Sequence, residues 1–194
     1  MTQLNLAYVC YKIATILLLC VIMGRHSLVF AQTSGQWSPD ERVPGYLDET
    51  FTPYLLADQN RTVHAFANQL VGDPNPQLAI VYRQWRLASG WTTPIDILLA
   101  PGGAQIIGAF LDAQGMMHVA FWGGDAQAAN IYYSRAPATG AGRAPAWLRP
   151  IPVGEGALSP ASGALAGDNQ GNLVIIYSGN SAGNGVYALI SDDN

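Results

Sequence analysis

One sequence unit runs three times through this chain. Tryptophans mark it at Trp37, Trp91 and Trp147. Aspartates mark it at Asp58, Asp112 and Asp168, and the two sets of markers keep identical spacings. Two independent markers that keep one period indicate a structural repeat. A repeat of about 55 residues, with short apolar runs separated by Gly, Pro, Asn and Asp, is typical of the four-stranded sheet that forms one blade of a β-propeller.

The composition favours a β-rich globular protein over a helical bundle or a disordered chain. The 194 residues are 49% hydrophobic and 11% charged, and 21 glycines and 12 prolines are available for turns. The net charge is −4, Lys12 is the only lysine, and the arginines are scattered singly between acidic residues. Nucleic acid is therefore not an expected partner, because binding to phosphates needs clustered cations.

The segment 1–31 is predicted to be an export signal. Lys12 precedes the apolar run 13–23, and Val29 and Ala31 are small residues at the −3 and −1 positions of a cleavage site before Gln32. An uncleaved membrane anchor or a buried helix are the alternatives, although this apolar run is short beside the about 20 residues that span a bilayer. The segment 32–194 is then the mature domain, secreted or extracytoplasmic, with a membrane contact only if the leader is retained.

Both cysteines, Cys10 and Cys20, lie in this leader. The mature chain therefore offers no disulfide, no thiol nucleophile and no Cys-based metal site. The three repeat aspartates supply one carboxylate per turn, whereas Ca²⁺ takes about six to eight oxygen ligands. We expect neither a metal nor a cofactor.

Each repeat can be divided into short strands. Two strands joined by a tight turn open the unit, in the runs 54–58 and 63–66, 108–112 and 117–122, and 163–168 and 173–177. A third strand is centred on an aromatic residue at a shared repeat position, Tyr82, Tyr133 or Tyr187. A fourth strand is predicted to begin at Trp91 and Trp147, and its prolines place it at the outer edge of the sheet.

Aspartate is predicted to organise the first turn of each repeat. The carboxylates of Asp112 and Asp168 are placed to accept backbone N–H groups, and Gly115 and Gly171 supply the positive φ that closes the turn. The structural turn positions of the chain are Asp58, Asp112, Gly115, Asp168 and Gly171. In the first copy Arg61 stands where the other two have Gly, which predicts a looser turn or one that is a residue longer.

The fold class expected is all-β and propeller-like, with about three four-stranded blades. The segment 37–43 matches the pattern of a fourth strand and the chain stops after a third strand, so an outer strand at the start could complete the last blade. A closed ring typically needs about four to eight blades. The chain is then a partial propeller within a longer protein, half of a dimeric six-bladed ring, or an open stack. Open sheet edges predict contact in a homodimer.

The repeats resemble those of the sialidase-like, BNR-type β-propellers that bacteria export. The resemblance depends on Asp-x-x-Gly-x-x-His-Val-x-Phe-Trp at 112–122, the aromatic strand 131–135 and the Trp-x-x-Pro elements, and it covers about 36–191. It implies a propeller fold, which hosts glycosidases, lyases and glycan-binding modules. The Asp-box of sialidases, Ser-x-Asp-x-Gly-x-x-Trp, is not matched, because the Asp and Gly spacing differs here and no Ser precedes them.

A sialidase-like active site would need an arginine cluster, an Asp as acid/base and a Tyr activated by Glu, as the resemblance implies. Arg42 stands before Val-Pro as the first arginine of that family stands before Ile-Pro. The only glutamates, Glu41, Glu49 and Glu155, lie in no recognisable motif. We therefore predict no catalytic residues. His64 and His118 are interpreted as packing residues, because the third copy has Val174 at the same position.

Arg83-Gln84-Trp85-Arg86 is the strongest candidate binding segment. An exposed indole flanked by guanidinium groups can stack on a sugar ring and hold its acidic substituents. Together with Arg135 on a later strand, Arg83, Trp85 and Arg86 are the predicted ligand-binding residues. The sequence thus predicts a module for binding or interaction, with extracellular glycan as the expected partner and no catalytic set of its own. The alternatives are a glycoside hydrolase completed by missing blades or a second chain, and a truncated paralogue without function.

Overall fold

A computed structural model describes residues 37–46, 50–100, 102–125, 129–158, 162–168 and 170–191. The predicted leader with Cys10 and Cys20 lies outside the described residues. Contacts divide the chain into two units, Met1–Glu41 and Arg42–Asn194, and the sheets belong to the second unit. No helix in the described part of the chain has the length and apolar character to cross a membrane.

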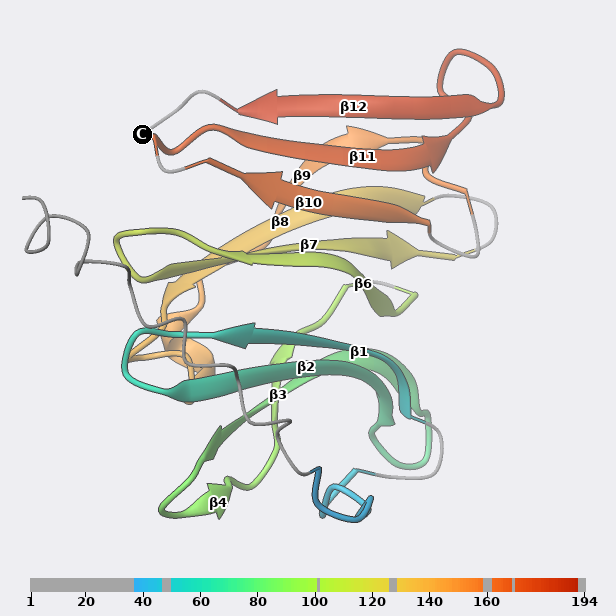
Figure 1. Ribbon diagram of the computed structural model, residues 1–194. Helices are drawn as coiled ribbons and strands as arrows, with labels where there is room; N and C mark the ends of the chain where they lie inside the picture. Colours follow the sequence, from blue (N-terminus) through green and yellow to red (C-terminus); the bar gives the residue numbers. More distant parts are fainter. Residues whose placement is uncertain are drawn as a thin grey trace, which may run out of the picture. The chain divides into compact units, whose positions relative to one another are not determined.

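The second unit is built of three antiparallel sheets, which follow one another along the chain (Figure 1). The first sheet contains β1 (Thr50–Ala57), β2 (Thr62–Val71), β3 (Gln77–Arg86), β4 (Gly90–Trp91) and β5 (Ile95–Leu98). The second sheet contains β6 (Ala104–Leu111), β7 (Met116–Gly124), β8 (Ala129–Pro137) and β9 (Ile151–Glu155). The third sheet contains β10 (Gly163–Gly167), β11 (Leu173–Gly179) and β12 (Gly185–Ser191). A 3-10 helix, η1 (Ala144–Ala146), lies between β8 and β9. The prediction of an all-β, propeller-like chain with three blades is confirmed, and the three sheets do not close into a ring.

The fourth strands begin later than the sequence predicted. Trp91 lies in the short strand β4 and Trp147 follows η1, whereas the longer outer strands β5 and β9 start at Ile95 and Ile151. These strands pair with β3 and β8 at the edge of their sheets, as the prolines indicated. The start is delayed because Pro94 and Pro150 lack an N–H for the ladder and restrict the residue before them.

The segment 37–43, predicted to form a fourth strand, contains no strand. Pro39 and Pro44 explain the difference, since each removes a ladder donor and constrains its neighbour within a short segment. The Trp37 side chain is 94% exposed, so the indole does not share the environment of the other repeat tryptophans.

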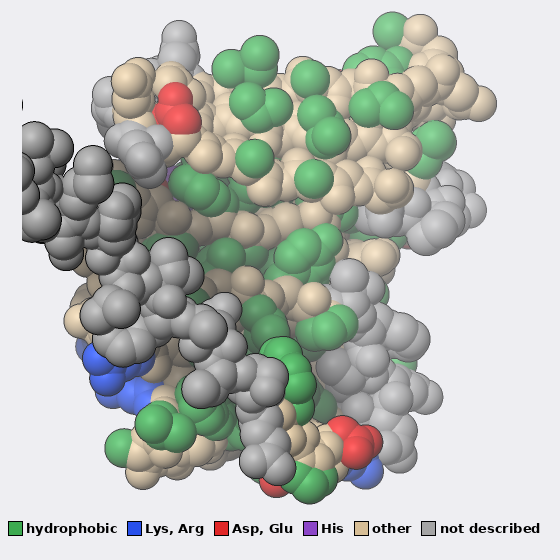
Figure 2. Space-filling view, in the orientation of Figure 1, with side chains coloured by type: hydrophobic (Ala, Val, Ile, Leu, Met, Phe, Trp, Pro, Cys, Tyr) green, Lys and Arg blue, Asp and Glu red, His purple; other side chains and the backbone are tan. Residues whose placement is uncertain are grey.

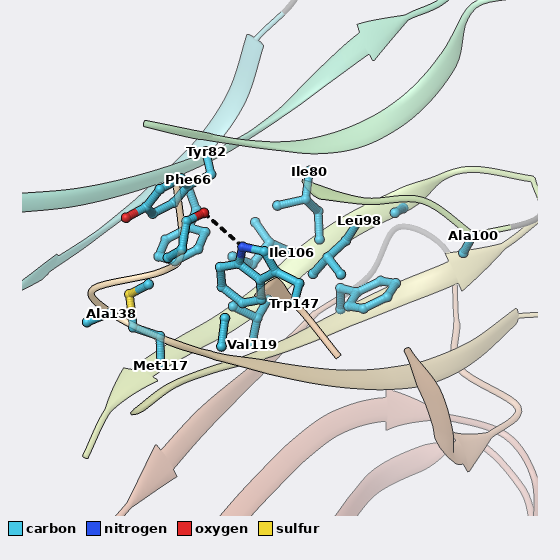
Figure 3. Close-up of a cluster of buried hydrophobic side chains, with 14 residues drawn as sticks. Phe66, Ile80, Tyr82, Leu98, Ala100, Ile106, Met117, Val119, Ala138 and Trp147 are labelled. Carbon is cyan, nitrogen blue, oxygen red and sulfur yellow. Dashed lines mark hydrogen bonds between the residues drawn. The ribbon is translucent and has the colours of Figure 1, made fainter. Parts of the chain in front are cut away.

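The first and second sheets pack face to face around Trp147. The first sheet contributes Phe66, Ile80 and Tyr82 to this core, and β7 contributes Met117, Val119 and Phe121 (Figure 3). The Trp147 indole is 6% exposed, lies edge-on to Phe66 with ring centroids 5.9 Å apart, and donates from Nε1 to the carbonyl of Ala141 at 3.0 Å. The indole thus fills the space between the sheets while its one polar atom is satisfied.

The second sheet is buried on its other face as well. There Ala120 and Trp122 of β7 meet side chains of the third sheet, including Leu173 and Ile175. At Gly108 the two sheets approach so closely that an added Cβ would lie 2.4 Å from the backbone nitrogen of Leu165. Only glycine fits at this contact.

An aspartate side chain bonds the backbone of the first turn in all three repeats. Oδ1 of the aspartate accepts the backbone N–H of the residue four positions later, Thr62 at 2.8 Å, Met116 at 2.7 Å and Asn172 at 3.0 Å. Gly115 and Gly171 have φ values of 79° and 95°. The first turn has the same length as the others, and the prediction of a looser or longer turn is wrong. Arg61 itself adopts φ 61°, because the ladder and the Asp58 carboxylate together impose the turn on a side chain that disfavours it.

Replacing Arg61 with Gly should therefore stabilise the protein. Removing the strain of a left-handed arginine should raise the free energy of unfolding by roughly 1–2 kcal/mol. Glycine also has more conformational freedom in the unfolded chain, which offsets part of this gain, so we expect a net increase of about 0.5–1 kcal/mol. Urea unfolding measures the change. Gly115→Ala, at a position with open space around the added Cβ, is the matched control and should lose about 1 kcal/mol. A loss of stability in both variants would contradict this account.

Truncation of the repeat tryptophans should have very different effects. Trp147→Ala removes the centre of a core and is expected to cost about 3–5 kcal/mol. Trp37→Ala, at an exposed position, should change the free energy of unfolding by less than about 0.5 kcal/mol. Chemical denaturation followed by circular dichroism measures both. Equal losses would show that the two indoles share one role.

Candidate functional site

A buried Asp–His–Tyr relay lies within the first sheet. His64 on β2 has its Nε2 3.3 Å from Oδ2 of Asp58 and its Nδ1 2.6 Å from the hydroxyl of Tyr82 on β3. Gln84 donates from Nε2 to the same hydroxyl at 2.8 Å. A carboxylate can only accept, so Nε2 of His64 carries the proton, and Nδ1 accepts from the Tyr82 hydroxyl. The neutral His64 ring with its proton on Nε2 therefore satisfies the hydrogen bonds to both Asp58 and Tyr82.

The second sheet repeats this relay. His118 has its Nε2 3.1 Å from Oδ2 of Asp112 and its Nδ1 2.6 Å from the hydroxyl of Tyr133. Arg135 stands opposite His118 in the ladder, at the position that Gln84 holds opposite His64 in the first sheet. Both histidines were predicted to be packing residues, and in the structure both nitrogens of each ring also make hydrogen bonds.

The third sheet contains no such relay in its described part. Val174 replaces the histidine, and Asp168 binds the side chain of Asn172 through Oδ2 at 2.7 Å instead. Tyr187 was predicted to share the position of Tyr82 and Tyr133, and this is wrong. The ladder partners of Tyr82 and Tyr133 are Phe66 and Ala120, which hold the same position in their repeats. Tyr187 pairs with Tyr177, which lies one position later in its repeat. A shift of one residue turns a side chain to the opposite face.

The electrostatics of the relay favour a structural role. Burial lowers the pKa of His64 below its ordinary 6.5, although Asp58 opposes this effect. Burial alone would raise the pKa of Asp58, but the N–H of Thr62 and the imidazole of His64 together hold it below 3.8. Burial also raises the pKa of Tyr82 to about 12, and its side chain is 1% exposed. A hydroxyl that is inaccessible and hard to ionise is a poor nucleophile.

Arg83 is the centre of a second polar group, which includes the rings of Tyr46 and Trp91. Its guanidinium donates from Nη1 to the Pro44 carbonyl and from Nη2 to the Thr92 carbonyl, and Cζ lies 5.2 Å from the centroid of each ring. Burial lowers the pKa of Arg83 and raises the pKa of Tyr46. We call Tyr46, Arg83, Trp85 and Trp91 the aromatic–arginine cluster.

The structure brings together only part of the predicted binding set. Arg83 was expected at the surface but is 3% exposed, because Pro44 and Thr92 bind its guanidinium and two rings cover it. Trp85 lies on the same face of β3, is half-buried, and stands directly opposite Trp91 in the ladder. Arg86 is exposed on the other face, where its Nε donates to Thr62 Oγ1 at 3.1 Å. Arg135 lies in the second sheet.

Tyr46 was not among the predicted site residues. It precedes the first strand and stands outside the repeat, so no pattern in the sequence connects it to Arg83. Trp91 served only as a marker of the period. Among the described residues, no three His, Cys, Asp or Glu side chains gather closely enough to hold a metal ion.

Comparison with known proteins identifies a similar fold but no matching family. No protein-family model matches the chain, and no curated protein matches it. A solved protein of unknown function from Dyadobacter fermentans superposes with a TM-score of 0.55 at 17% identity, over 73% of this chain and 50% of that one. The chain thus spans about half the length of that protein, with which it shares the fold.

Two further solved structures show weaker similarity. A glycosyl hydrolase from Bacteroides ovatus aligns with a TM-score of 0.45 at 13% identity, over 74% of this chain and 46% of that one. A fucose lectin from Kordia zhangzhouensis, solved in complex with methyl-fucoside, aligns with a TM-score of 0.42 at 14% identity, over 74% of this chain and 94% of that one.

The relay predicts a specific loss of stability in acid. Because the folded pKa of His64 lies below 6.5, its contribution is complete above that pH and declines as the pH falls toward the folded pKa. Asp58 and Asp112, with folded pKa values below 3.8, add a second decline only below that pH. Urea unfolding between about pH 7 and pH 5 measures the first decline.

His64→Val, which copies the third sheet, is the matched variant. It should be less stable at every pH, because Asp58 and Tyr82 lose a partner, but its stability should depend less on pH in this upper range. The decline below 3.8 should remain, since Asp112 is unchanged. Parallel pH profiles of the parent and the variant between about pH 7 and pH 5 would exclude a buried neutral His64.

Proposed function

We propose that this chain is an exported, propeller-type binding module whose ligand is extracellular glycan, bound at the aromatic–arginine cluster. The observation that carries the proposal is the pairing of Trp85 with Trp91. The two indoles stand opposite each other on β3 and β4, on the strand face that also holds Arg83, and both are half-buried.

Half-buried indoles are suited to sugar rings. The C–H faces of a pyranose stack on an aromatic face, and the fixed indole loses little conformational freedom on binding. Arg83 supports this arrangement as a positioning residue, because its guanidinium is held by two backbone carbonyls and lies against the Trp91 ring. Arg86, which follows Trp85, is exposed on the opposite face of β3 and lies outside the cluster.

Binding to immobilised oligosaccharides tests the proposal, with neutral and carboxylated glycans of equal length as probes. Trp85→Ala and Trp91→Ala should each weaken binding by about tenfold or more, as expected for a central aromatic contact. Trp37→Ala, an exposed indole elsewhere in the sequence, is the control and should bind like the parent. Arg86→Gln, at a side chain on the opposite face of β3, is a second control and should bind both probes like the parent.

Two outcomes would overturn the proposal. A folded parent that binds none of the probes would remove its basis. Release of free sugar, lost in Glu155→Gln or Asp112→Asn while binding persists, would favour the alternative of a glycoside hydrolase. The matched circular dichroism spectra of parent and variants would show that the comparison concerns folded proteins.

A further inference from the structure

The third sheet has one face that no other described part of the chain covers. We call it the outer face; it consists of the side chains that alternate with Leu173, Ile175 and Tyr177. Its rows follow the ladder: Ala164, Ile176 and Ala188; Ala166, Val174 and Ile190; Ser178 and Val186. Val174 and Ile176 are 39% and 43% exposed, and Val186 and Ile190 are 78% and 75% exposed. Figure 2 shows apolar side chains spread over this sheet.

The repeat indicates what such a face is for. Phe66 in the first sheet and Ala120 in the second occupy the position that Ile176 has in the third, and both are 0% exposed because the next sheet packs on them. The outer face is therefore the third member of a series of packing surfaces. Strands β10, β11 and β12 contain no charged residue, so a covering surface meets no buried charge.

We infer that the outer face is a dimerisation surface and that a second copy of this chain covers it, face to face. The face is complementary to itself. β10 contributes only alanines, Ala164 and Ala166, whereas the opposite strand β12 contributes the branched residues Val186 and Ile190. A two-fold axis along β11 lays β12 of each copy over β10 of the other, so that large side chains meet small ones.

A six-bladed ring would pair the faces differently. It would place the outer face against the first sheet, on the face formed by Ala65, Ala67 and Val81. These three residues are already buried, at 3%, 0% and 1% exposed, whereas Leu55 beside Ala65 on the same face is 63% exposed. A ring would first have to expose these buried side chains, whereas pairing of two outer faces requires no such rearrangement.

The size of the face sets the expected strength. Strands of 5, 7 and 7 residues cover roughly 300 Å² of sheet. This is well below the about 800 Å² per partner of a standard interface. The dimer should therefore be weak, forming at concentrations of about 0.1 mM or higher. This inference does not depend on glycan binding, since the aromatic–arginine cluster lies in the first sheet.

Solution mass of the full chain, measured by light scattering and sedimentation over a series of concentrations, tests the inference. The parent should pass from monomer to dimer as the concentration rises. Ile176→Lys with Ile190→Lys should abolish the rise, because two buried ammonium groups would face each other across the axis. Val186→Lys alone, at the most exposed position of the face, is the second variant if the double variant does not fold.

Leu55→Lys is the matched control. Leu55 is 63% exposed and pairs with Ala65, on the face of the first sheet that a ring would use. It should dimerise like the parent. A parent that stays monomeric throughout, a dimer that survives substitution of the outer face, or a dimer that Leu55→Lys abolishes would each overturn the inference.

Discussion

A β-sheet that is apolar on both faces must be covered on both, and this requirement governs the arrangement of the chain. The second sheet meets it: one face packs around Trp147 and the other packs on Leu173 and Ile175. Contact on two sides fixes the spacing of all three sheets, which is why a glycine is needed at position 108, where two backbones come together. The second sheet positions the first and the third, and each of these two presents one face that the second sheet does not cover.

The Asp–His–Tyr relays allow polar groups to lie within these apolar layers. Each relay joins a turn aspartate to a histidine on the second strand and a tyrosine on the third, so the turn, the ladder and the packing of a sheet depend on one another. An aspartate beside a histidine and a tyrosine resembles catalytic machinery when it is read from the residue types alone. Burial and the direction of the pKa shifts make this set a means of holding a sheet together.

The period, the strands and the aspartate turns could be predicted because they depend on local rules: turn chemistry, alternation and the exclusion of proline from a ladder. The turn at Arg61 could not, because the ladder on either side overrides the preference of one residue. The burial of Arg83 depends on the carbonyl of Pro44, which is far away in the sequence. Tyr187 has nearly the same spacing in the sequence as Tyr82 and Tyr133, but a difference of one residue in strand register places its side chain on the opposite face of the sheet. The three repeat tryptophans share a period but not an environment, and no spacing distinguishes them.

The relays also bear on how such a chain can change length during evolution. All members of a relay belong to one sheet, while the contacts between sheets are mainly apolar. Duplication or deletion of a whole repeat unit therefore moves each histidine together with both its partners. The relays in the units that remain therefore keep their partners. The hydrogen bonds that cross between sheets do not: the Tyr54 hydroxyl donates to the Ile107 carbonyl, and Asn68 Oδ1 accepts the Ile106 N–H. A gene for such a protein can thus gain or lose whole units with its relays intact, and new partners are needed only for the few polar groups that bond across sheets.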